Sequence, residues 1–159
     1  LLASYNIPLI INDRLDVALA VDADGLHIGQ QDMPYTIARK ILGYDKIIGL
    51  SVENIEQAKE TNKLDVDYIG ISPVFITGTK TDTGTPLGLE GLKEIAAFSK
   101  HIIVGIGGIH AGNAAEVIKS GAHGVAVVSA IVAADDPLCA AHEIRKVVDT
   151  CRKSDKMVQ

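Results

Sequence analysis

The sequence predicts an α/β fold, specifically a (β/α)8 TIM barrel that is incomplete at its N-terminus and carries about six β-α units. Strand-like and helical segments alternate strictly, which is typical of a parallel sheet. Polar and small residues gather at the carboxyl ends of the strand-like segments, where TIM barrels place their ligands. An open, doubly wound sheet fits 159 residues more easily, but no Gly-x-Gly-x-x-Gly motif follows the first strand. We therefore expect two further β-α units to precede residue 1.

Short apolar runs rich in Ile and Val predict the strands. In chain order they lie at 7–12, 25–29, 47–52, 67–72, 102–106 and 124–128. The last two runs are apolar throughout, which indicates strands that are buried on both faces.

Segments with helical periodicity separate the strands and lie at 14–23, 34–43, 53–63, 88–100, 113–120 and 137–152. Asp136 and Pro137 mark the start of the last helix, and Gly121 follows the end of the helix at 113–120. Ser51 precedes the helix at 53–63, so its hydroxyl is a candidate cap as well as a candidate ligand contact.

Composition limits the classes of partner. The chain is 47% hydrophobic with a formal net charge of −5, and its lysines are scattered. These features predict a single domain over 1–159 with a polar tail at 153–159, and they argue against nucleic acid as a partner. No apolar run is long enough to cross a membrane. Small-molecule substrates are the expected partners, and a homo-oligomer stays open.

The two cysteines indicate the compartment. Cys139 and Cys151 lie on one expected helix, about 18 Å apart along its axis, which is too far for a disulfide. Unpaired thiols favour a reducing, cytoplasmic location.

Two strand ends near the C-terminus are typical of a phosphate cradle. Gly107 and Gly108 follow one strand, and Ser129 follows the next, which ends at Val128, and leads into a short apolar turn. Backbone N–H groups and a short helix N-terminus after strands 7 and 8 of a TIM barrel commonly hold an anion in this way. Ordinary turns after two core strands explain the same residues equally well.

Two carboxylates follow the first two strands. Asp13 and Asp32 would lie on neighbouring strand ends, where they could jointly hold Mg²⁺ with substrate phosphate oxygens completing its shell. Each also precedes a helical segment, so an N-cap role is the alternative.

The longest loop, from Pro73 to Pro86, supplies further candidates. Thr77, Thr79 and Lys80 carry hydroxyl and ammonium donors without a competing carboxylate, as expected of a phosphate-facing surface. The alternative is a polar surface loop. The five histidines show no metal-ligand spacing, and we interpret all of them as structural or solvated.

The strand-end motifs together resemble the thiamine phosphate synthase family, also called thiamine-phosphate pyrophosphorylase. The resemblance extends in order from Pro8 to about Pro137. It is carried by segments 8–13, 25–34, 48–52, 67–70, 73–75, 86–92, 105–109 and 127–131.

The resemblance implies an enzyme that joins 4-amino-2-methyl-5-hydroxymethylpyrimidine diphosphate to 4-methyl-5-(2-hydroxyethyl)thiazole phosphate, releasing pyrophosphate. The implied mechanism is dissociative, with Mg²⁺ as cofactor. By resemblance, Asp13 and Asp32 bind the metal and Asn12 and Lys80 contact the pyrophosphate. Ser51 hydrogen-bonds near the reacting centre, so that Ser51 and Lys80 are the expected catalytic residues. The thiazole phosphate is assigned to Thr77, Thr79, Gly108, Val128 and Ser129.

The chain departs from the family at one point. Family members carry a Gln-x-Arg-x-Lys motif on the second barrel strand, and the sequence begins after that strand. A thiazole tautomerase of the same fold and an inactive phosphate-binding fragment are therefore the alternatives. Neither needs Asn12, Asp13, Asp32 and Lys80 together, which favours the synthase.

Overall fold

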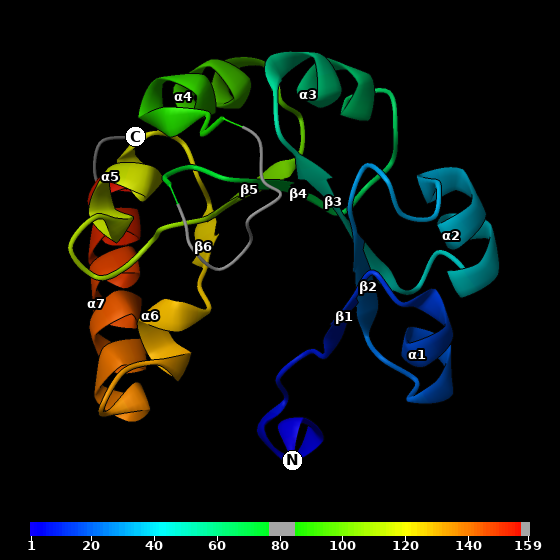
Figure 1. The fold of residues 1–159 in the computed structure, drawn as a ribbon, viewed down its shortest axis with the longest axis horizontal. Helices are drawn as coiled ribbons and strands as arrows, with labels where there is room; N and C mark the ends of the chain where they lie inside the picture. Colours follow the sequence, from blue (N-terminus) through cyan, green and yellow to red (C-terminus); the bar gives the residue numbers. More distant parts are fainter. Residues whose placement is uncertain (77–84, 157–159) are drawn as a thin grey trace.

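The computed structural model describes residues 1–76 and 85–156. Its six parallel strands follow one another in chain order and curl into a half-barrel, with the main helices on the outside (Figure 1). The strands are β1 (Ile10–Asn12), β2 (Gly25–Ile28), β3 (Ile47–Val52), β4 (Tyr68–Ile71), β5 (Ile102–Ile106) and β6 (Gly124–Ala126). The helices are η1 (Leu2–Tyr5), α1 (Leu15–Ala20), α2 (Tyr35–Leu42), α3 (Ile55–Thr61), α4 (Gly88–Phe98), α5 (Ala114–Lys119), α6 (Ser129–Val132) and α7 (Pro137–Lys156).

The predicted fold class is confirmed, and the element boundaries differ mainly at the ends. β3 and β5 coincide with the predicted runs, whereas β1 starts only at Ile10. Pro8 has no N–H to donate to a sheet, and the Leu9 amide is bound by the Asp24 side chain at 2.7 Å. The segment expected as a polar tail begins inside α7, which continues to Lys156.

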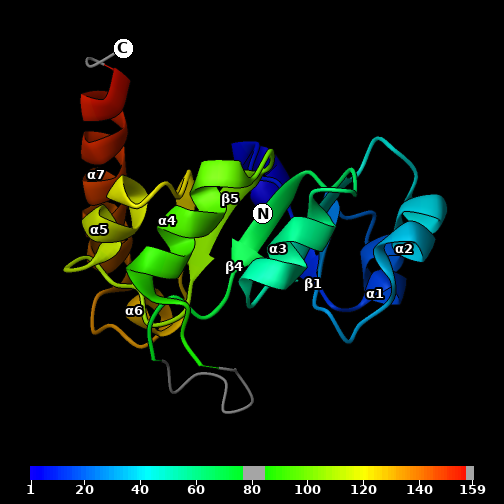
Figure 2. The same ribbon diagram turned by 90° about the horizontal axis from the view of Figure 1, so that it is seen from above.

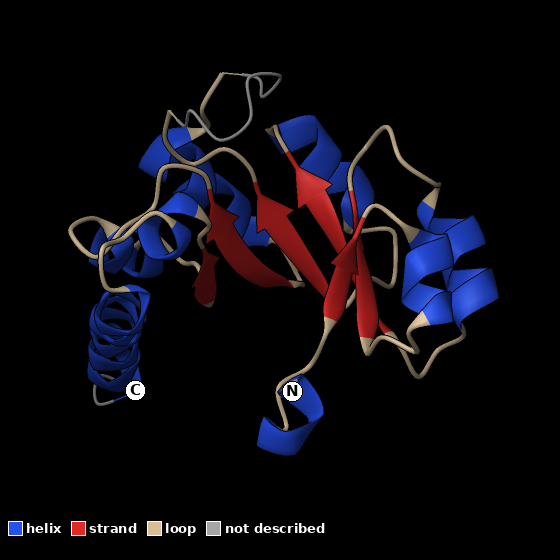
Figure 3. Ribbon diagram, turned by 60° about the horizontal axis from the view of Figure 1, so that its bottom comes forward, coloured by secondary structure: helices blue, strands red, loops and turns tan. Residues whose placement is uncertain are grey.

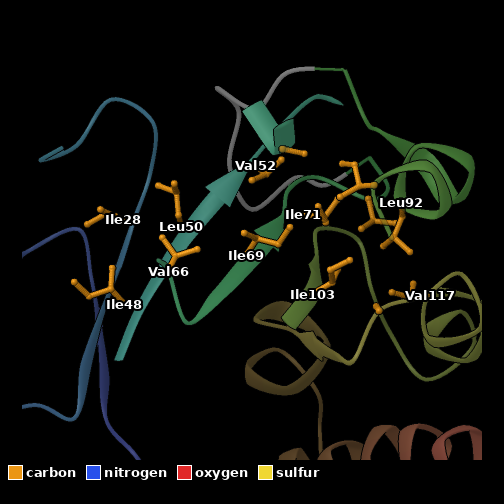
Figure 4. Close-up of a cluster of buried hydrophobic side chains, with 14 of the residues drawn as sticks. Ile28, Ile48, Leu50, Val52, Val66, Ile69, Ile71, Leu92, Ile103 and Val117 are labelled. Carbon is orange, nitrogen blue, oxygen red and sulfur yellow. The ribbon is translucent and has the colours of Figure 1, made fainter. Parts of the chain in front are cut away.

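Figures 2 and 3 show from two further directions that the helices lie along one face of the sheet. The hydrophobic core lies between the sheet and these helices. Alternate strand residues point outward into this layer, and Ile28, Ile48 and Ile69 are 0% exposed (Figure 4). Helix residues such as Leu92 and Val117 close the core from the outside.

The strand register places a row of side chains on the opposite, concave face. Asn12 pairs with His27, His27 with Gly49, and Gly49 with Tyr68. One step nearer the carboxyl ends, Ser51 pairs with Gly70. The concave face therefore carries the polar residues of the sheet, together with apolar residues such as Ile10, Ile102 and Val104.

The expectation that β5 and β6 are buried on both faces is wrong. Ile103 is buried, but Ile102 is 54% exposed and Val128, just past β6, is 50% exposed. Successive strand side chains alternate between faces, and the concave face is covered less well than the helix-covered face. None of the helices in the described ranges has the length and apolar character needed to span a membrane.

Candidate active site at the carboxyl edge of the sheet

The two candidate metal ligands line the same surface cavity. Asp13 follows β1, Asp32 follows β2, and both border an open cavity of about 430 Å³ together with residues of α1 and α2. The side chains of Asp13 and Asp32 do not cap these helices, which start after Arg14 and Pro34 without a side-chain cap. Hard carboxylate oxygens on neighbouring strand ends suit Mg²⁺, which binds proteins through one or two carboxylates.

The main chain is fixed at Asp13, and a hydrogen bond orients the carboxylate of Asp32. Asp13 has a φ of 63°, a left-handed conformation that costs a non-glycine residue energy, and its N–H donates to the His27 carbonyl oxygen at 2.8 Å. Asp32 Oδ2 accepts the Gly29 N–H at 2.6 Å. No group of three or more His, Cys, Asp and Glu side chains suited to a metal occurs in the described residues, so a bound ion would complete its shell with water or substrate.

Ser51 lies on the concave face and takes part in a hydrogen-bonded cluster. Its Oγ is 2.9 Å from His27 Nε2, and the Tyr68 hydroxyl is 2.9 Å from His27 Nδ1. The helix that follows is capped instead by Asn54, whose Oδ1 accepts the Gln57 N–H at 2.8 Å. The Ser51 hydroxyl is therefore available for a role other than helix capping.

Glycines make room for this cluster. A Cβ atom on Gly49 would lie 2.1 Å from the ring of Tyr68, and one on Gly70 would lie 3.1 Å from the ring of His27. The His27 and Tyr68 rings consequently stack across Gly49, with centroids 5.4 Å apart. Burial raises the pKa of the Tyr68 phenol above its ordinary value.

The predicted phosphate cradle after β5 is held by two hydrogen bonds. The Gly107 carbonyl accepts the Phe75 N–H at 3.1 Å, and the Gly108 carbonyl accepts Asn113 Nδ2 at 2.9 Å. C=O and N–H point in opposite directions across a trans peptide, so the N–H groups of Gly108 and Ile109 point away from these partners. Neither N–H donates to another described residue.

The glycines of the cradle are required by shape. Gly107 and Gly108 have φ values of 101° and 63°. A Cβ on Gly108 would lie 2.6 Å from the Ile76 carbonyl oxygen, so a side chain there would displace the segment after β4.

Val128 and Ser129 follow β6 and begin α6, which has four residues. Such a short helix contributes little dipole, so an anion here would depend on backbone N–H groups and the Ser129 hydroxyl. Asn12 ends β1 on the concave face, beside Asp13. Thr77, Thr79 and Lys80 lie outside the described residues.

These elements define an α/β protein of the TIM-barrel class, with its candidate site at the carboxyl edge of parallel strands. The family model for thiamine monophosphate synthase matches residues 1–131, and the chain belongs to this family.

Individual relatives agree with this assignment. The thiamine-phosphate synthase of Albidiferax ferrireducens is 54% identical over 94% of the chain and 68% of its own length. The thiamine-phosphate synthase of Moorella thermoacetica is 52% identical over 90% of the chain and 68% of its own length. A solved thiamine phosphate pyrophosphorylase from Pyrococcus furiosus superposes with a TM-score of 0.85 at 43% identity, covering 94% of the chain and 71% of the solved protein.

Sequence reasoning missed two residues of this region, His27 and Asn113. The alternation of Leu26, His27 and Ile28 could have identified the first, since it places His27 on the face opposite two fully buried side chains. Asn113 precedes α5 and resembles an ordinary cap, and only the fold shows that it holds the Gly108 peptide.

Proposed function

We propose that the chain catalyses the synthase reaction, in which the pyrimidine diphosphate and the thiazole phosphate combine into thiamine phosphate and pyrophosphate. The observation that carries this proposal is that two separate groups of residues suited to binding anions lie along one edge of the sheet. Carboxylates after β1 and β2 suit a metal-bound pyrophosphate, and the glycine turn after β5 suits a monophosphate. Membership of the family supports the same reading.

The metal half of the site comprises Asp13 and Asp32, with Asn12 beside them. Bound Mg²⁺ would neutralise charge on the pyrophosphate oxygens. Asp32 uses Oδ2 to accept the Gly29 amide, which orients its carboxylate at the cavity. Asn12 would donate its side-chain amide to a pyrophosphate oxygen, and Lys80, which we assign from the family resemblance, would add a positive charge.

The thiazole half comprises Gly108, Val128 and Ser129, with Thr77 and Thr79 assigned from the resemblance. Backbone N–H groups and hydroxyls bind a phosphate without requiring a change in protonation. The monophosphate would anchor the thiazole so that its ring nitrogen faces the pyrimidine methylene carbon.

The proposed reaction needs no protein nucleophile. The bond between the methylene carbon and the pyrophosphate oxygen breaks, and its electron pair leaves with the oxygen. The thiazole nitrogen then donates its lone pair to form the new C–N bond. The protein contributes by stabilising the leaving group and aligning the two substrates, with Ser51 donating a hydrogen bond near the reacting centre.

Other features support a small-molecule enzyme of the cytoplasm. Cys139 and Cys151 are free thiols, as expected in a reducing compartment. The formal net charge of −5 does not suit nucleic acid as a partner.

The direct test is to incubate the protein with both substrates and Mg²⁺ and to measure thiamine phosphate and pyrophosphate by chromatography. We expect thiamine phosphate and pyrophosphate in equal amounts. A protein that instead isomerises a thiazole phosphate without consuming the pyrimidine would be a tautomerase, and one that binds phosphate without either reaction would be a binding module.

A further inference from the structure

The cluster on the concave face fixes which hydrogen-bonding role Ser51 can play. Its members are His27 on β2, Ser51 on β3 and Tyr68 on β4, which define the His27 cluster. A neutral imidazole has one nitrogen that donates and one that accepts, so the bond at Nδ1 determines the role of Nε2. The two possible arrangements leave the Ser51 hydroxyl either as a donor or as an acceptor toward a ligand.

The Tyr68 hydroxyl decides between the two arrangements. Its only hydrogen-bond partner among the described residues is His27 Nδ1, at 2.9 Å. A phenol is a better donor than acceptor, and an imidazole nitrogen lone pair is a good acceptor. If Tyr68 accepted from Nδ1 instead, its own proton would be left without a described acceptor in a half-buried position.

The remaining directions then follow. Tyr68 donates to His27 Nδ1, so the ring proton lies on Nε2 and is donated to Ser51 Oγ at 2.9 Å. The Ser51 proton stays available for another acceptor. Because each hydrogen bond in such a chain polarises the next, Ser51 becomes a stronger donor than an isolated serine.

The surrounding backbone fixes Ser51 further. Gln30 Nε2 donates to the Ser51 carbonyl oxygen at 2.6 Å, which ties β3 to the loop that carries Asp32. The His27 ring lies over Gly70 and the Tyr68 ring lies over Gly49, so a side chain at either glycine would displace the rings. The backbone at Ser51 is thus linked to the loop that carries Asp32.

We infer that His27 and Tyr68 are positioning residues that hold the Ser51 hydroxyl as a hydrogen-bond donor toward the pyrimidine diphosphate. The matching group is an acceptor on that substrate, either a ring nitrogen or a phosphate oxygen. This inference rests on the proposed synthase function and adds two residues that act through Ser51.

The first measurement is independent of activity. Nitrogen NMR of histidine-labelled protein distinguishes the two tautomers, and the His27 signals are assigned by their loss in His27→Gln. We expect the tautomer with the proton on Nε2, and we expect Tyr68→Phe to shift the Nδ1 signal. A proton on Nδ1 in the unaltered protein would overturn the inference.

The second measurement is steady-state kinetics with matched variants. His27→Ala should lower kcat about tenfold, consistent with the loss of one oriented hydrogen bond, and should leave the KM for thiazole phosphate unchanged. His27→Gln should recover much of that loss, because its amide can still reach Ser51. His142→Ala, on the exposed side of α7, is the control for removing a histidine.

A double-variant cycle tests whether His27 acts through Ser51. In a Ser51→Ala background, His27→Ala should lower kcat by less than about twofold, because the hydroxyl that His27 positions is already absent. Additive losses would contradict a role through Ser51. If His27→Ala does not fold, Tyr68→Phe removes a single hydroxyl and allows the same comparison.

The outcomes separate the inference from the function on which it rests. An unaltered protein that forms no thiamine phosphate would refute the proposed function, while the NMR measurement would still test the cluster. An active protein whose His27 and Tyr68 variants keep full kcat would refute the inference alone.

Discussion

Arg39 and Asp67 form an ion pair at the amino-terminal edge of the sheet, with Arg39 Nη2 donating to Asp67 Oδ2 at 2.7 Å. The same carboxylate oxygen accepts the Ile48 amide at 2.7 Å. Arg39 Nη1 also donates to the carbonyl oxygens of Gly43 and Lys46. One nearly buried guanidinium therefore ties α2 to the starts of β3 and β4, far from the candidate site.

Replacing Arg39 should destabilise the fold without changing the site. Arg39→Met removes the guanidinium that donates to Asp67 and to two carbonyl groups, and the free energy of unfolding should fall by about 3 kcal/mol. Denaturant unfolding measures this change. Lys63→Met is the control, because the Lys63 and Glu60 side chains of its ion pair are 68% and 71% exposed and such pairs contribute little. Equal losses in the two variants would contradict the assigned role of Arg39.

Gly108→Ala should weaken binding of thiazole phosphate. The new Cβ would meet Phe75 and the Ile76 carbonyl, and alanine at a φ of 63° costs about 1 kcal/mol in addition. We expect about a tenfold higher Kd for thiazole phosphate by calorimetry.

Gly88→Ala is the matched control for this substitution. Gly88 has a φ of 67°, but a Cβ there would meet nothing within 4 Å. It should lose only the backbone cost, about 1 kcal/mol, and keep its affinity for thiazole phosphate. An unchanged Kd in Gly108→Ala would show that Gly108 does not contribute to the binding of thiazole phosphate.

Asp32→Asn should raise the Mg²⁺ concentration needed for half-maximal turnover about tenfold or more, because the variant loses a charged metal ligand. The asparagine oxygen can still accept the Gly29 amide, so stability should change little. A Mg²⁺ titration of the initial rate measures the effect. If the variant needs the same Mg²⁺ concentration as the unaltered protein, Asp32 does not bind the metal and acts only by accepting the Gly29 amide.

The stability of the protein should fall at alkaline pH partly because of Tyr68. Burial raises its pKa in the folded state above the ordinary value of 10.0. The stabilisation is complete below pH 10 and is lost as pH rises from there through the folded-state pKa, because the unfolded chain releases the proton first.

Tyr68→Phe should therefore show a shallower loss of unfolding free energy as the pH rises above the ordinary tyrosine value of 10.0. Denaturant unfolding across this range measures it. Tyr5→Phe, at a residue 69% exposed, is the control for removing a phenol. Identical slopes for the unaltered protein and Tyr68→Phe would contradict the burial effect.

The order of strands and helices could be predicted because each strand is a short β-branched run between turn residues. β3 and β5 were located to the residue in this way. The start of β1 was not, since the apolar run includes Pro8, and only the fold shows that Asp24 takes the Leu9 amide.

Candidate residues could be selected where they lie within a few residues after a strand, as Asp13, Asp32 and Gly108 do. His27 could not be assigned from spacing, because its partners Ser51 and Tyr68 are 24 and 41 residues away in sequence. Their contact depends on strand register and on two glycines that open space between the strands. Such register is a property of the assembled sheet.

Titration calorimetry of thiazole phosphate, with and without Mg²⁺ and pyrophosphate, tests the two-site account most directly. The account predicts that thiazole phosphate binds in both conditions, and that pyrophosphate binds as a second ligand only when Mg²⁺ is present. Pyrophosphate that competes with thiazole phosphate, or that binds equally well without Mg²⁺, would contradict two separate anion sites on one sheet edge.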